Sequence, residues 1–364
     1  MSGSSKLFQE LEHIYEVKKR ISRGTFSVVY LAEVRKTSPP LKVALKRITP
    51  TSSPERIARE IQMLHDLGGN CHISPILTAH RSRDQVTLVM PYFQHDQFRE
   101  YYNKLTLNEL KLYLRALFES LAFIHSQGII HRDIKPSNFL YNRKDFSFQL
   151  IDFGLAQKVS KPEPTTYTNS NATSVRGIVP PSNRKITARL TRKSTATTAR
   201  TGSSSSSGQP PTSRTSLPSV SRAGTRGFRA PEILLLVQKQ TTAIDIWSVG
   251  SILLCIASQR YPFFNSPDDL TALAEMAHLY GSKQLHEAAI CLDRSITLPE
   301  KLPAIPLKEL CTKLSGNPDL FPDELYDLLE RCLEPKPDIR ISAKQALSHP
   351  FLAIQDENSK PPSL

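Results

Sequence analysis

The stretch that decides the fold is HRDIKPSNFLYNRKDFSFQLIDFG, residues 131–154. It gathers several charged and amide side chains into one short segment: Asp133, Asp152, Asn138, Lys135 and Arg132. Such groups are seldom buried without partners, so a folding core alone would rarely tolerate this density. The residue types therefore indicate chemistry rather than packing.

This segment is expected to fold as a loop, a strand pair and a second turn. Residues 139–141 and 148–151 are short β-like runs, separated by the polar turn 142–145. Asp133 and Asp152 then flank a hairpin, which brings their carboxylates close together. Because neighbouring carboxylates repel each other, the arrangement predicts a cation beside them, either Lys135 or a bound magnesium ion.

Asp133 ends the tripeptide His-Arg-Asp, Asn138 follows five residues later, and Asp152 opens Asp-Phe-Gly. Either tripeptide alone is a weak signal. The two tripeptides in this order, together with the asparagine, resemble the H-R-D-x-x-x-x-N and D-F-G motifs of the eukaryotic protein kinase family. The resemblance implies an α+β, bilobal protein kinase fold. Its small lobe is an antiparallel β-sheet with one main helix, and its larger lobe is mostly helical.

The same resemblance implies an ATP-dependent protein phosphotransferase. Asp133 would accept or orient the proton of the substrate hydroxyl, and Lys135 would neutralise the γ-phosphate during transfer. Asn138 and Asp152 would hold Mg²⁺. A lysine two positions after Asp133 is typical of a serine/threonine kinase. The alternative is a buried ion-pair cluster without catalysis.

Upstream, residues 17–23 and 27–32 are expected to form two strands joined by a turn that contains Gly24. Such a turn can lay backbone N–H groups over phosphates, although most glycine turns are plain hairpins. It departs from the family's G-x-G-x-x-G pattern, because Ser22 and Ser27 replace the first and third glycines. Serine is small, so a working but less pliable lid over ATP is expected. The nucleotide contacts implied for this region are Ile21, Ser22, Gly24 and Val29.

Residues 43–46 form an apolar run, Val-Ala-Leu-Lys, that ends in Lys46. Taken alone, Lys46 would be a lysine snorkelling at a strand end. Ahead of the two motifs it resembles the kinase V-A-I-K strand, whose lysine grips the α- and β-phosphates. The resemblance thus implies nucleotide contacts at Lys46 and Ala44.

Lys46 needs a carboxylate to hold it in place, and a helix expected over residues 54–67 offers two. Glu60 is the candidate partner because it lies beside the helix's apolar inner face. Glu55 is closer to the helix start, where a carboxylate complements the helix dipole. The inner face consists of Ile57, Ile61 and Leu64.

Residues 86–90 are expected to form a strand that leads to a rigid bend at 91–93, between the two lobes. In kinases the backbone of this hinge hydrogen-bonds the adenine, so the resemblance implies nucleotide contacts at Met90 and Tyr92. Met90 as core filler is an equally open interpretation, and the two are compatible.

A capping box, Thr106 to Glu109, predicts a helix that runs to Gln127 and stops at Gly128. Its apolar stripe is expected to be core, supporting the loop that follows. The stripe consists of Leu110, Tyr113, Leu114, Leu117, Leu121 and Ile124.

Residues 160–224 are rich in Ser, Thr, Pro, Arg and Lys, and Tyr167 is their only aromatic residue. They carry ten basic residues and one acid, so they supply +9 of the chain's formal charge of +13. This composition cannot bury enough apolar area to offset ordering entropy, which predicts a disordered insertion in the activation segment. It is open whether the insertion is an inert tether, a nuclear-import or docking segment, or a phosphorylated regulatory loop.

Beyond the insertion, the family resemblance implies three scaffold features. Thr225 would hydrogen-bond Asp133 and Lys135. Glu232 would pair with the buried Arg340. Asp245 would start an apolar helix through residue 257 and anchor the catalytic loop.

Composition excludes several other classes of protein. The five cysteines are scattered without a C-x-x-C pair, so neither a disulfide framework nor a zinc site is indicated. This fits a reducing compartment. No apolar run approaches the ~18 residues of a membrane span, and residues 1–10 lack a signal-peptide core.

Several segments narrow the family further: 135–142, 222–232, 241–245, 260–264 and 268–274, together with the long insertion. They resemble the catalytic subunit of DDK, the cell-division-cycle kinase that phosphorylates the MCM helicase at replication origins. The resemblance implies a nuclear kinase that a regulatory subunit switches on, with no direct nucleic-acid binding required and no membrane. The short connection 314–322 departs from the second large insertion common in that family.

The expected organisation is a lead-in at 1–14, a small lobe at 15–90, a large lobe at 91–352 and a tail at 353–364. Residues 1–10 are expected to be loose or only marginally ordered. Two alternatives remain open. One is a cell-cycle or casein-kinase-like serine/threonine kinase that acts alone. The other is a kinase-fold scaffold that no longer transfers phosphate.

Overall fold

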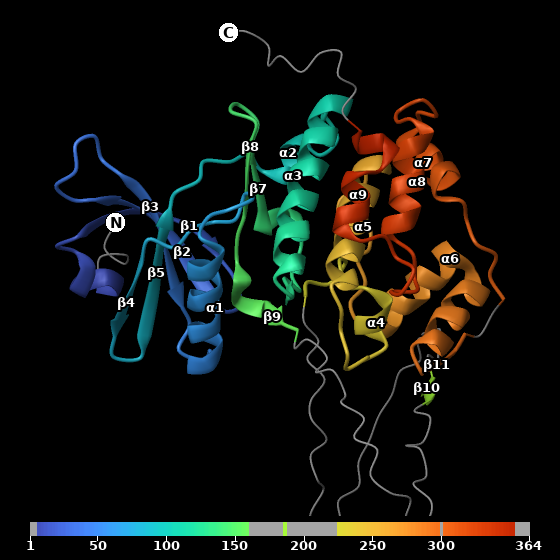
Figure 1. Ribbon diagram of the computed structural model, residues 1–364, viewed down its shortest axis with the longest axis horizontal. Helices are drawn as coiled ribbons and strands as arrows, with labels where there is room; N and C mark the ends of the chain where they lie inside the picture. Colours follow the sequence, from blue (N-terminus) through green and yellow to red (C-terminus); the bar gives the residue numbers. More distant parts are fainter. Residues whose placement is uncertain (1–5, 160–184, 188–223, 299–300, 354–364) are drawn as a thin grey trace, which may run out of the picture.

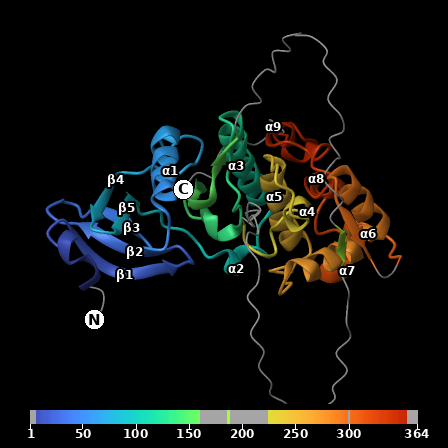
Figure 2. The ribbon, with the colours of Figure 1, turned by 90° about the horizontal axis from the view of Figure 1, so that it is seen from below.

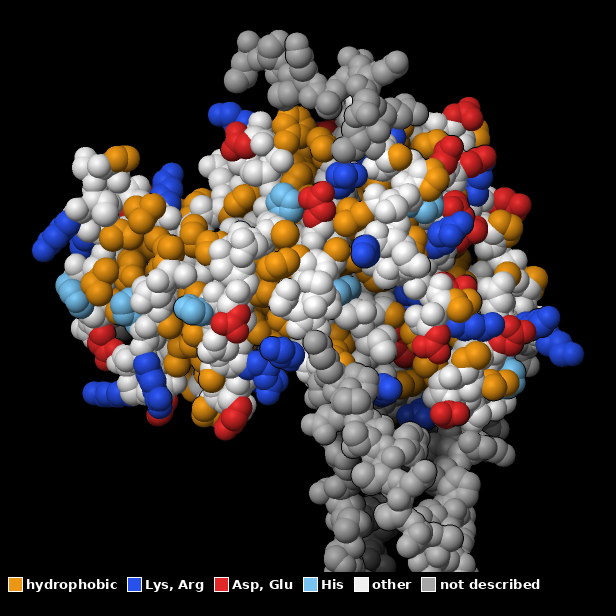
Figure 3. All heavy atoms as spheres, viewed as in Figure 1, with side chains coloured by type: hydrophobic (Ala, Val, Ile, Leu, Met, Phe, Trp, Pro, Cys, Tyr) orange, Lys and Arg blue, Asp and Glu red, His pale blue; other side chains and the backbone are white. Residues whose placement is uncertain are grey.

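The computed structural model describes residues 6–159, 185–187, 224–298 and 301–353. Figure 1 shows a β-sheet lobe beside a larger helical lobe, and Figure 2 shows the same division from below. The predicted α+β class and bilobal architecture are therefore confirmed. On the face drawn in Figure 3, basic and acidic side chains are interspersed over both lobes of the described chain.

The small lobe is built on one five-stranded antiparallel sheet in the order β1-β2-β3-β5-β4. All four predicted strands are present within it, and β4 joins as an edge strand. The register of β1 against β2 shifts twice, once between Val17 and Lys19 and once between Arg20 and Ser22. Such bulges increase the local twist of a strand. The strands are β1 Tyr15–Arg23, β2 Ser27–Val34, β3 Lys42–Ile48, β4 Thr78–Ser82 and β5 Gln85–Pro91.

The lead-in is not loose where the structure describes it. Residues Lys6–Leu11 form a 3-10 helix, η1, and the Phe8 side chain is only 3% exposed. Its ring packs edge-on against Tyr30 with centroids 5.0 Å apart, and the Arg47 guanidinium lies 5.4 Å from it. The expectation of a loose segment was wrong here because one aromatic side chain completes the core of the small lobe.

Helix α1, Pro54–Leu67, has the predicted bounds, and local chemistry explains both ends. Ser53 caps the start by accepting a hydrogen bond from the Arg56 N–H, and Pro54 occupies the first turn. Gly68 ends the helix in the left-handed region, with φ of 57°. Glu60 lies on the buried face of α1, one turn from Arg56.

The large lobe is mostly helical, and helices α3, Leu107–Ser126, and α5, Ala243–Ala257, lie in its buried core. The capping box of α3 is present, the helix caps at Gln127, and the predicted stripe is fully buried. Every residue of α5 but its first is buried. Within the described ranges no helix is both long and apolar enough to cross a membrane. The helices are α2 Phe98–Tyr101, α3 Leu107–Ser126, α4 Pro231–Leu234, α5 Ala243–Ala257, α6 Asp269–Cys291, α7 Leu307–Ser315, α8 Asp323–Cys332 and α9 Ala343–Leu347, with a final 3-10 turn η4 Pro350–Leu352.

The segment around residues 131–154 folds as predicted, into a loop, a hairpin and a turn. The Ile151 N–H donates to the Asn138 carbonyl at 2.9 Å, in register with the pair Phe139 and Leu150. Asn138 already belongs to the 3-10 turn before the first strand, and the second strand ends at Leu150, one residue earlier than expected. The elements are β6 Ile129–Ile130, η2 Pro136–Asn138, β7 Phe139–Asn142, β8 Ser147–Leu150, η3 Phe153–Leu155 and β9 Gln157–Lys158.

Most of the predicted insertion at 160–224 lies outside the described residues. Within it, β10, Lys185–Thr187, pairs in parallel with β11, Ser295–Thr297. No strand was expected there, because backbone pairing with a distant edge is not visible in composition. Helix α6 was also left unassigned, since its moderately apolar sequence is interrupted by Gly281.

Replacing Phe8 by alanine is expected to lower the free energy of unfolding by about 3–5 kcal/mol, because it removes a buried ring and leaves a cavity. The control is Phe146→Ala, which removes a ring that is 45% exposed and should change stability by about 0.5 kcal/mol or less. Urea unfolding followed by circular dichroism measures both. Equal losses for the two variants would contradict the packing role of Phe8.

Candidate active site

The loop after β6 is held by one buried carboxylate. Asp245, on α5, accepts hydrogen bonds from the backbone N–H of His131 and of Arg132, both at 2.8 Å. Its Oδ2 also lies 2.9 Å from His125 Nε2. Arg132 is thereby held at φ of 69°, a region unfavourable for a side-chain-bearing residue. Asp245 thus anchors the loop as predicted, although α5 begins two residues earlier, at Ala243.

The Asp133 carboxylate sits in a closed network of hydrogen bonds. Thr225 Oγ1 donates to Asp133 Oδ1 at 2.7 Å and accepts from Lys135 Nζ at 2.7 Å. Lys135 Nζ also lies 2.8 Å from Asp133 Oδ2. The predicted contacts of Thr225 are therefore present, and they join two segments that the insertion separates in sequence.

Asn138 stands behind Asp133 and is 5% exposed. Its Nδ2 donates to the Asp133 carbonyl at 2.9 Å and to Asp133 Oδ2 at 3.1 Å. Because its amide nitrogen is used in this way, its amide oxygen is the atom left for a metal.

Lys46 joins three elements through two ion pairs. Its Nζ lies 2.6 Å from Glu60 Oε1 on α1 and 2.7 Å from Asp152 Oδ1 after β8. Burial disfavours the charged ammonium, but the two carboxylates outweigh this effect, so the pKa of Lys46 is raised. Glu60 is thus the partner, as predicted, and Glu55 lies in the first turn of α1.

Asp152 occupies the left-handed region at φ of 67° and opens the turn η3. Burial would raise the pKa of its carboxyl, but the charge and hydrogen bond of Lys46 outweigh burial and hold the pKa well below the usual range. The side chain is still 40% exposed. Asp152 is therefore an ionised oxygen donor. Carboxylate and amide oxygens, which Asp152 and Asn138 would supply, are the ligands that suit a hard divalent cation.

A cavity of about 590 Å³ lies between the lobes and receives most of these groups. This volume falls in the range of small-molecule sites. Six predicted site residues line the cavity: Gly24, Lys46, Glu60, Asp133, Lys135 and Asp152. Two clusters of a lysine with its carboxylates, one around Lys46 and one around Lys135, thus converge on the space where the sequence predicted a nucleotide site.

The other predicted nucleotide contacts do not line this cavity. Ala44 and Met90 are register partners in β3 and β5, and Val29 lies opposite Lys46 in β2. Tyr92 follows β5 and donates its N–H to the Lys42 carbonyl at 3.2 Å. Ile21 and Ser22 lie at the bulged end of β1. The strand register therefore places these residues on the sheet around Lys46, and their contact with adenine stays a prediction.

The glycine turn differs from expectation in one respect. The Gly24 N–H donates to the Ser27 carbonyl at 2.9 Å, so this amide closes the turn itself. The cavity also has walls that the sequence analysis missed, chiefly Phe26, Arg56 and Gly154. Arg56 could have been found, because it lies four residues before Glu60 and therefore on the same face of α1.

Behind the site, Glu232 and Arg340 form the predicted buried pair. Arg340 Nη1 lies 2.8 Å from Glu232 Oε1, and Arg340 Nη2 lies 3.1 Å from Glu232 Oε2. The guanidinium also covers the Trp247 ring at 5.1 Å. A bidentate pair that is satisfied in this way joins α4 to the segment before α9.

The protein kinase domain family matches residues 15–176 and 203–352. This chain is therefore a protein kinase, a class that uses ATP and a divalent metal. The unmatched gap, 177–202, falls within the predicted insertion.

The chain is similar to "Probable cell division control protein 7 homolog 1" of Encephalitozoon cuniculi, with 38% identity over 96% of this chain and 97% of that protein. It is 34% identical to "Cell cycle serine/threonine-protein kinase hsk1" of Schizosaccharomyces pombe, over 97% of this chain and 75% of that protein. It is 37% identical to "Probable serine/threonine-protein kinase cdc7" of Dictyostelium discoideum over 95% of this chain, which spans 41% of that protein. The chain belongs to this family of cell-division serine/threonine kinases.

Replacing Thr225 by alanine is expected to lower kcat by about 100-fold, because Asp133 and Lys135 lose the hydroxyl that sets their geometry. Thr225→Ser keeps the hydroxyl and should retain most of the activity. Steady-state phosphorylation of a serine peptide measures both variants. Equal activity of the alanine and serine variants would show that the hydroxyl has no such role.

The Asp152 pKa predicts a pH dependence of stability. Because its folded pKa lies below the unfolded value of about 3.9, ionised Asp152 stabilises the fold above that pH, and the contribution is lost as pH falls through the folded pKa. The difference in unfolding free energy between the parent chain and Asp152→Asn should thus be constant from pH 6 to 8 and shrink below about pH 4. Urea titrations at several pH values measure it. A difference that grows on acidification would contradict the assignment.

Proposed function

We propose that this chain is the catalytic subunit of a DDK-type kinase. With Mg²⁺ held by Asn138 and Asp152, it phosphorylates MCM helicase subunits in the nucleus and promotes initiation of DNA replication once a regulatory subunit binds. The observation that carries the proposal is similarity along 94–97% of the chain to relatives named for the cell cycle and cell division.

The site supports catalysis rather than a scaffold role. Lys46 and Lys135 place two cations at the cavity, where they suit the phosphates of ATP. Asp133 lines the same cavity with its carboxylate held at both oxygens, so a substrate hydroxyl that enters would meet an oriented proton acceptor. These contacts support phosphoryl transfer as the activity of the site.

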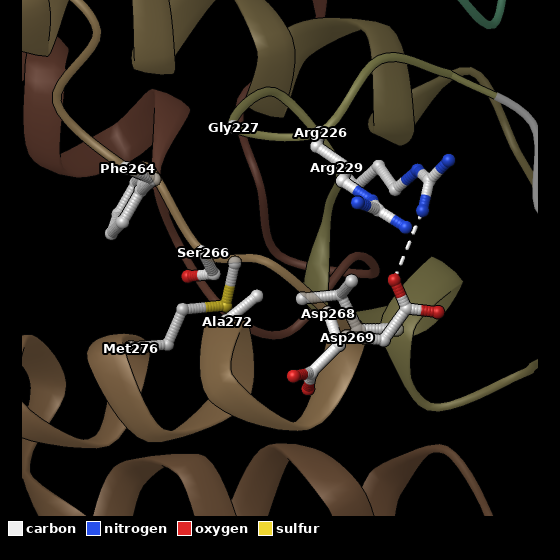
Figure 4. A pocket seen from close by; sticks show the side chains of 10 residues that line it. Arg226, Gly227, Arg229, Phe264, Ser266, Asp268, Asp269, Ala272 and Met276 are labelled. Carbon is white, nitrogen blue, oxygen red and sulfur yellow. Dashed lines mark hydrogen bonds and ion pairs between the residues drawn. The ribbon is translucent and has the colours of Figure 1, made fainter.

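Two arginines beside Thr225 favour an acidic protein substrate. Figure 4 shows Arg226 and Arg229 side by side near the start of α6, with the Asp269 carboxylate turned toward them and the Asp268 carboxylate pointing away. Arg229 Nη1 pairs with Asp269 Oδ1 at 2.9 Å, so its charge is partly compensated. Arg226 is exposed, lines the main cavity, and has no ion pair within the described part of the chain. Arg226 is therefore the better candidate to attract an acidic peptide.

One observation favours the alternative of a kinase that acts alone. The Lys46–Glu60 ion pair is already closed at 2.6 Å in the single chain. If a regulatory subunit worked only by bringing α1 toward Lys46, its main effect would already be present. A subunit requirement must then come from another step, such as ordering the activation segment or binding substrate.

The deciding experiment measures phosphorylation of an MCM-type amino-terminal tail by the chain alone and by the chain co-expressed with a DDK-type regulatory subunit. The proposal expects activity that depends on the subunit, and full activity of the isolated chain would favour the stand-alone alternative. Asp133→Asn is the negative control and should be inactive in both forms. Absence of phosphorylation in both forms, despite activity on a generic serine peptide, would refute the proposed substrate.

A further inference from the structure

The Arg56 guanidinium contacts two parts of the active site that are distant in sequence. Its Nε donates to the Gly154 carbonyl at 2.6 Å, just after Asp152. One face of the guanidinium covers the Phe26 ring, and the Arg56 Cζ atom lies 3.8 Å from the ring centroid. A planar guanidinium can bond in its plane and stack on an aromatic ring at the same time, which an ammonium group does less well.

Phe26 is the tip of the turn that joins β1 to β2, and its ring is 42% exposed. The backbone at the tip is fixed on the other side, because the Phe26 carbonyl accepts from Thr49 N at 2.8 Å and from Thr49 Oγ1 at 3.1 Å. Serines replace two of the family's three glycines around this tip. The ring contact with Arg56 is therefore a side-chain anchor that holds the turn over the cavity.

Gly154 is the second partner, and a side chain at this position would be crowded by its neighbours. A Cβ atom on Gly154 would lie 3.2 Å from Asp152 Oδ1, 3.2 Å from Glu60 Oε2 and 3.3 Å from Arg56 Nη2. Because Gly154 has no side chain, these three polar side chains can lie close to its backbone, and Arg56 is one of them.

Arg56 and Glu60 lie one turn apart on the same face of α1. Glu60 holds Lys46, while Arg56 holds Gly154 and Phe26. A displacement of α1 away from the sheet would therefore break the Lys46–Glu60 ion pair and the contact of Arg56 with Phe26 together. The position of the lid is mechanically linked to the position of the helix.

We propose that Arg56 is a positioning residue that clasps the tip of the nucleotide-binding turn, through Phe26, to α1 and to the segment after Asp152. The clasp keeps the turn closed over the ATP phosphates whenever α1 is in place. Arg56 itself touches no reacting atom. It acts on the nucleotide through the turn that it holds.

The test is a double-mutant cycle with Arg56→Ala, Phe26→Leu and the double variant in the full chain. Binding of adenylyl imidodiphosphate with Mg²⁺, measured by calorimetry, should weaken roughly 3- to 30-fold in each single variant. The double variant should be no weaker than the worse single variant, because one contact is removed in either case. Multiplicative effects in the double variant would overturn the clasp.

A second readout separates positioning from general destabilisation. KM for ATP should rise in Arg56→Ala with a smaller change in kcat, and hydrogen exchange should increase at residues 24–28. A merely structural loss would lower the active fraction, and thus kcat, at unchanged KM. Arg20→Ala removes the same charge from an exposed site on β1 and should leave binding and exchange unchanged.

The binding readout needs no regulatory subunit and no particular protein substrate. Unchanged affinity and exchange in Arg56→Ala would therefore refute the clasp while leaving the proposed DDK-type function intact.

Discussion

The buried ammonium of Lys46 is the constraint on which the active site depends. A charge that is only 6% exposed costs several kcal/mol unless its partners stay in place. Its partners come from two other places in the chain, helix α1 and the turn after β8. The sheet, helix α1 and the turn after β8 are therefore held at fixed mutual positions by these ion pairs. The hydrophobic core alone would not specify those positions so narrowly.

In the large lobe, buried carboxylates hold distant segments together in the way that Lys46 does in the small lobe. Asp245 is 1% exposed and is satisfied by two backbone N–H groups and a histidine, so the loop that carries Asp133 must keep its strained conformation. Glu232 is satisfied by Arg340, which fixes the far end of the activation segment. The Thr225 hydroxyl then links the activation segment to the catalytic loop, because it donates a hydrogen bond to the Asp133 carboxylate. Buried ionic groups define this site because each has partners in distant segments.

The sequence predicted much of this arrangement, and its omissions have physical causes. Helix α1 and the cap of α3 followed from local signals, which act within one turn and are visible in sequence. Phe8 was missed because a single aromatic residue in a polar lead-in carries no periodicity. The contact of Arg56 with Phe26 was missed for another reason: it depends on where the turn tip lands relative to α1, about thirty residues away in sequence.

By itself, the sequence determined the kinase class, the residues that carry charge into the cleft, and the helices whose ends have capping residues. Residue type and short-range spacing are enough for these. Only the tertiary structure decided that Asp152 joins Glu60 in pairing with Lys46, that Phe8 completes the core of the small lobe, and that Arg56 joins the lid to the helix. These contacts depend on the relative placement of packed elements within a few ångströms, which burial and buried charge determine together and no local pattern encodes.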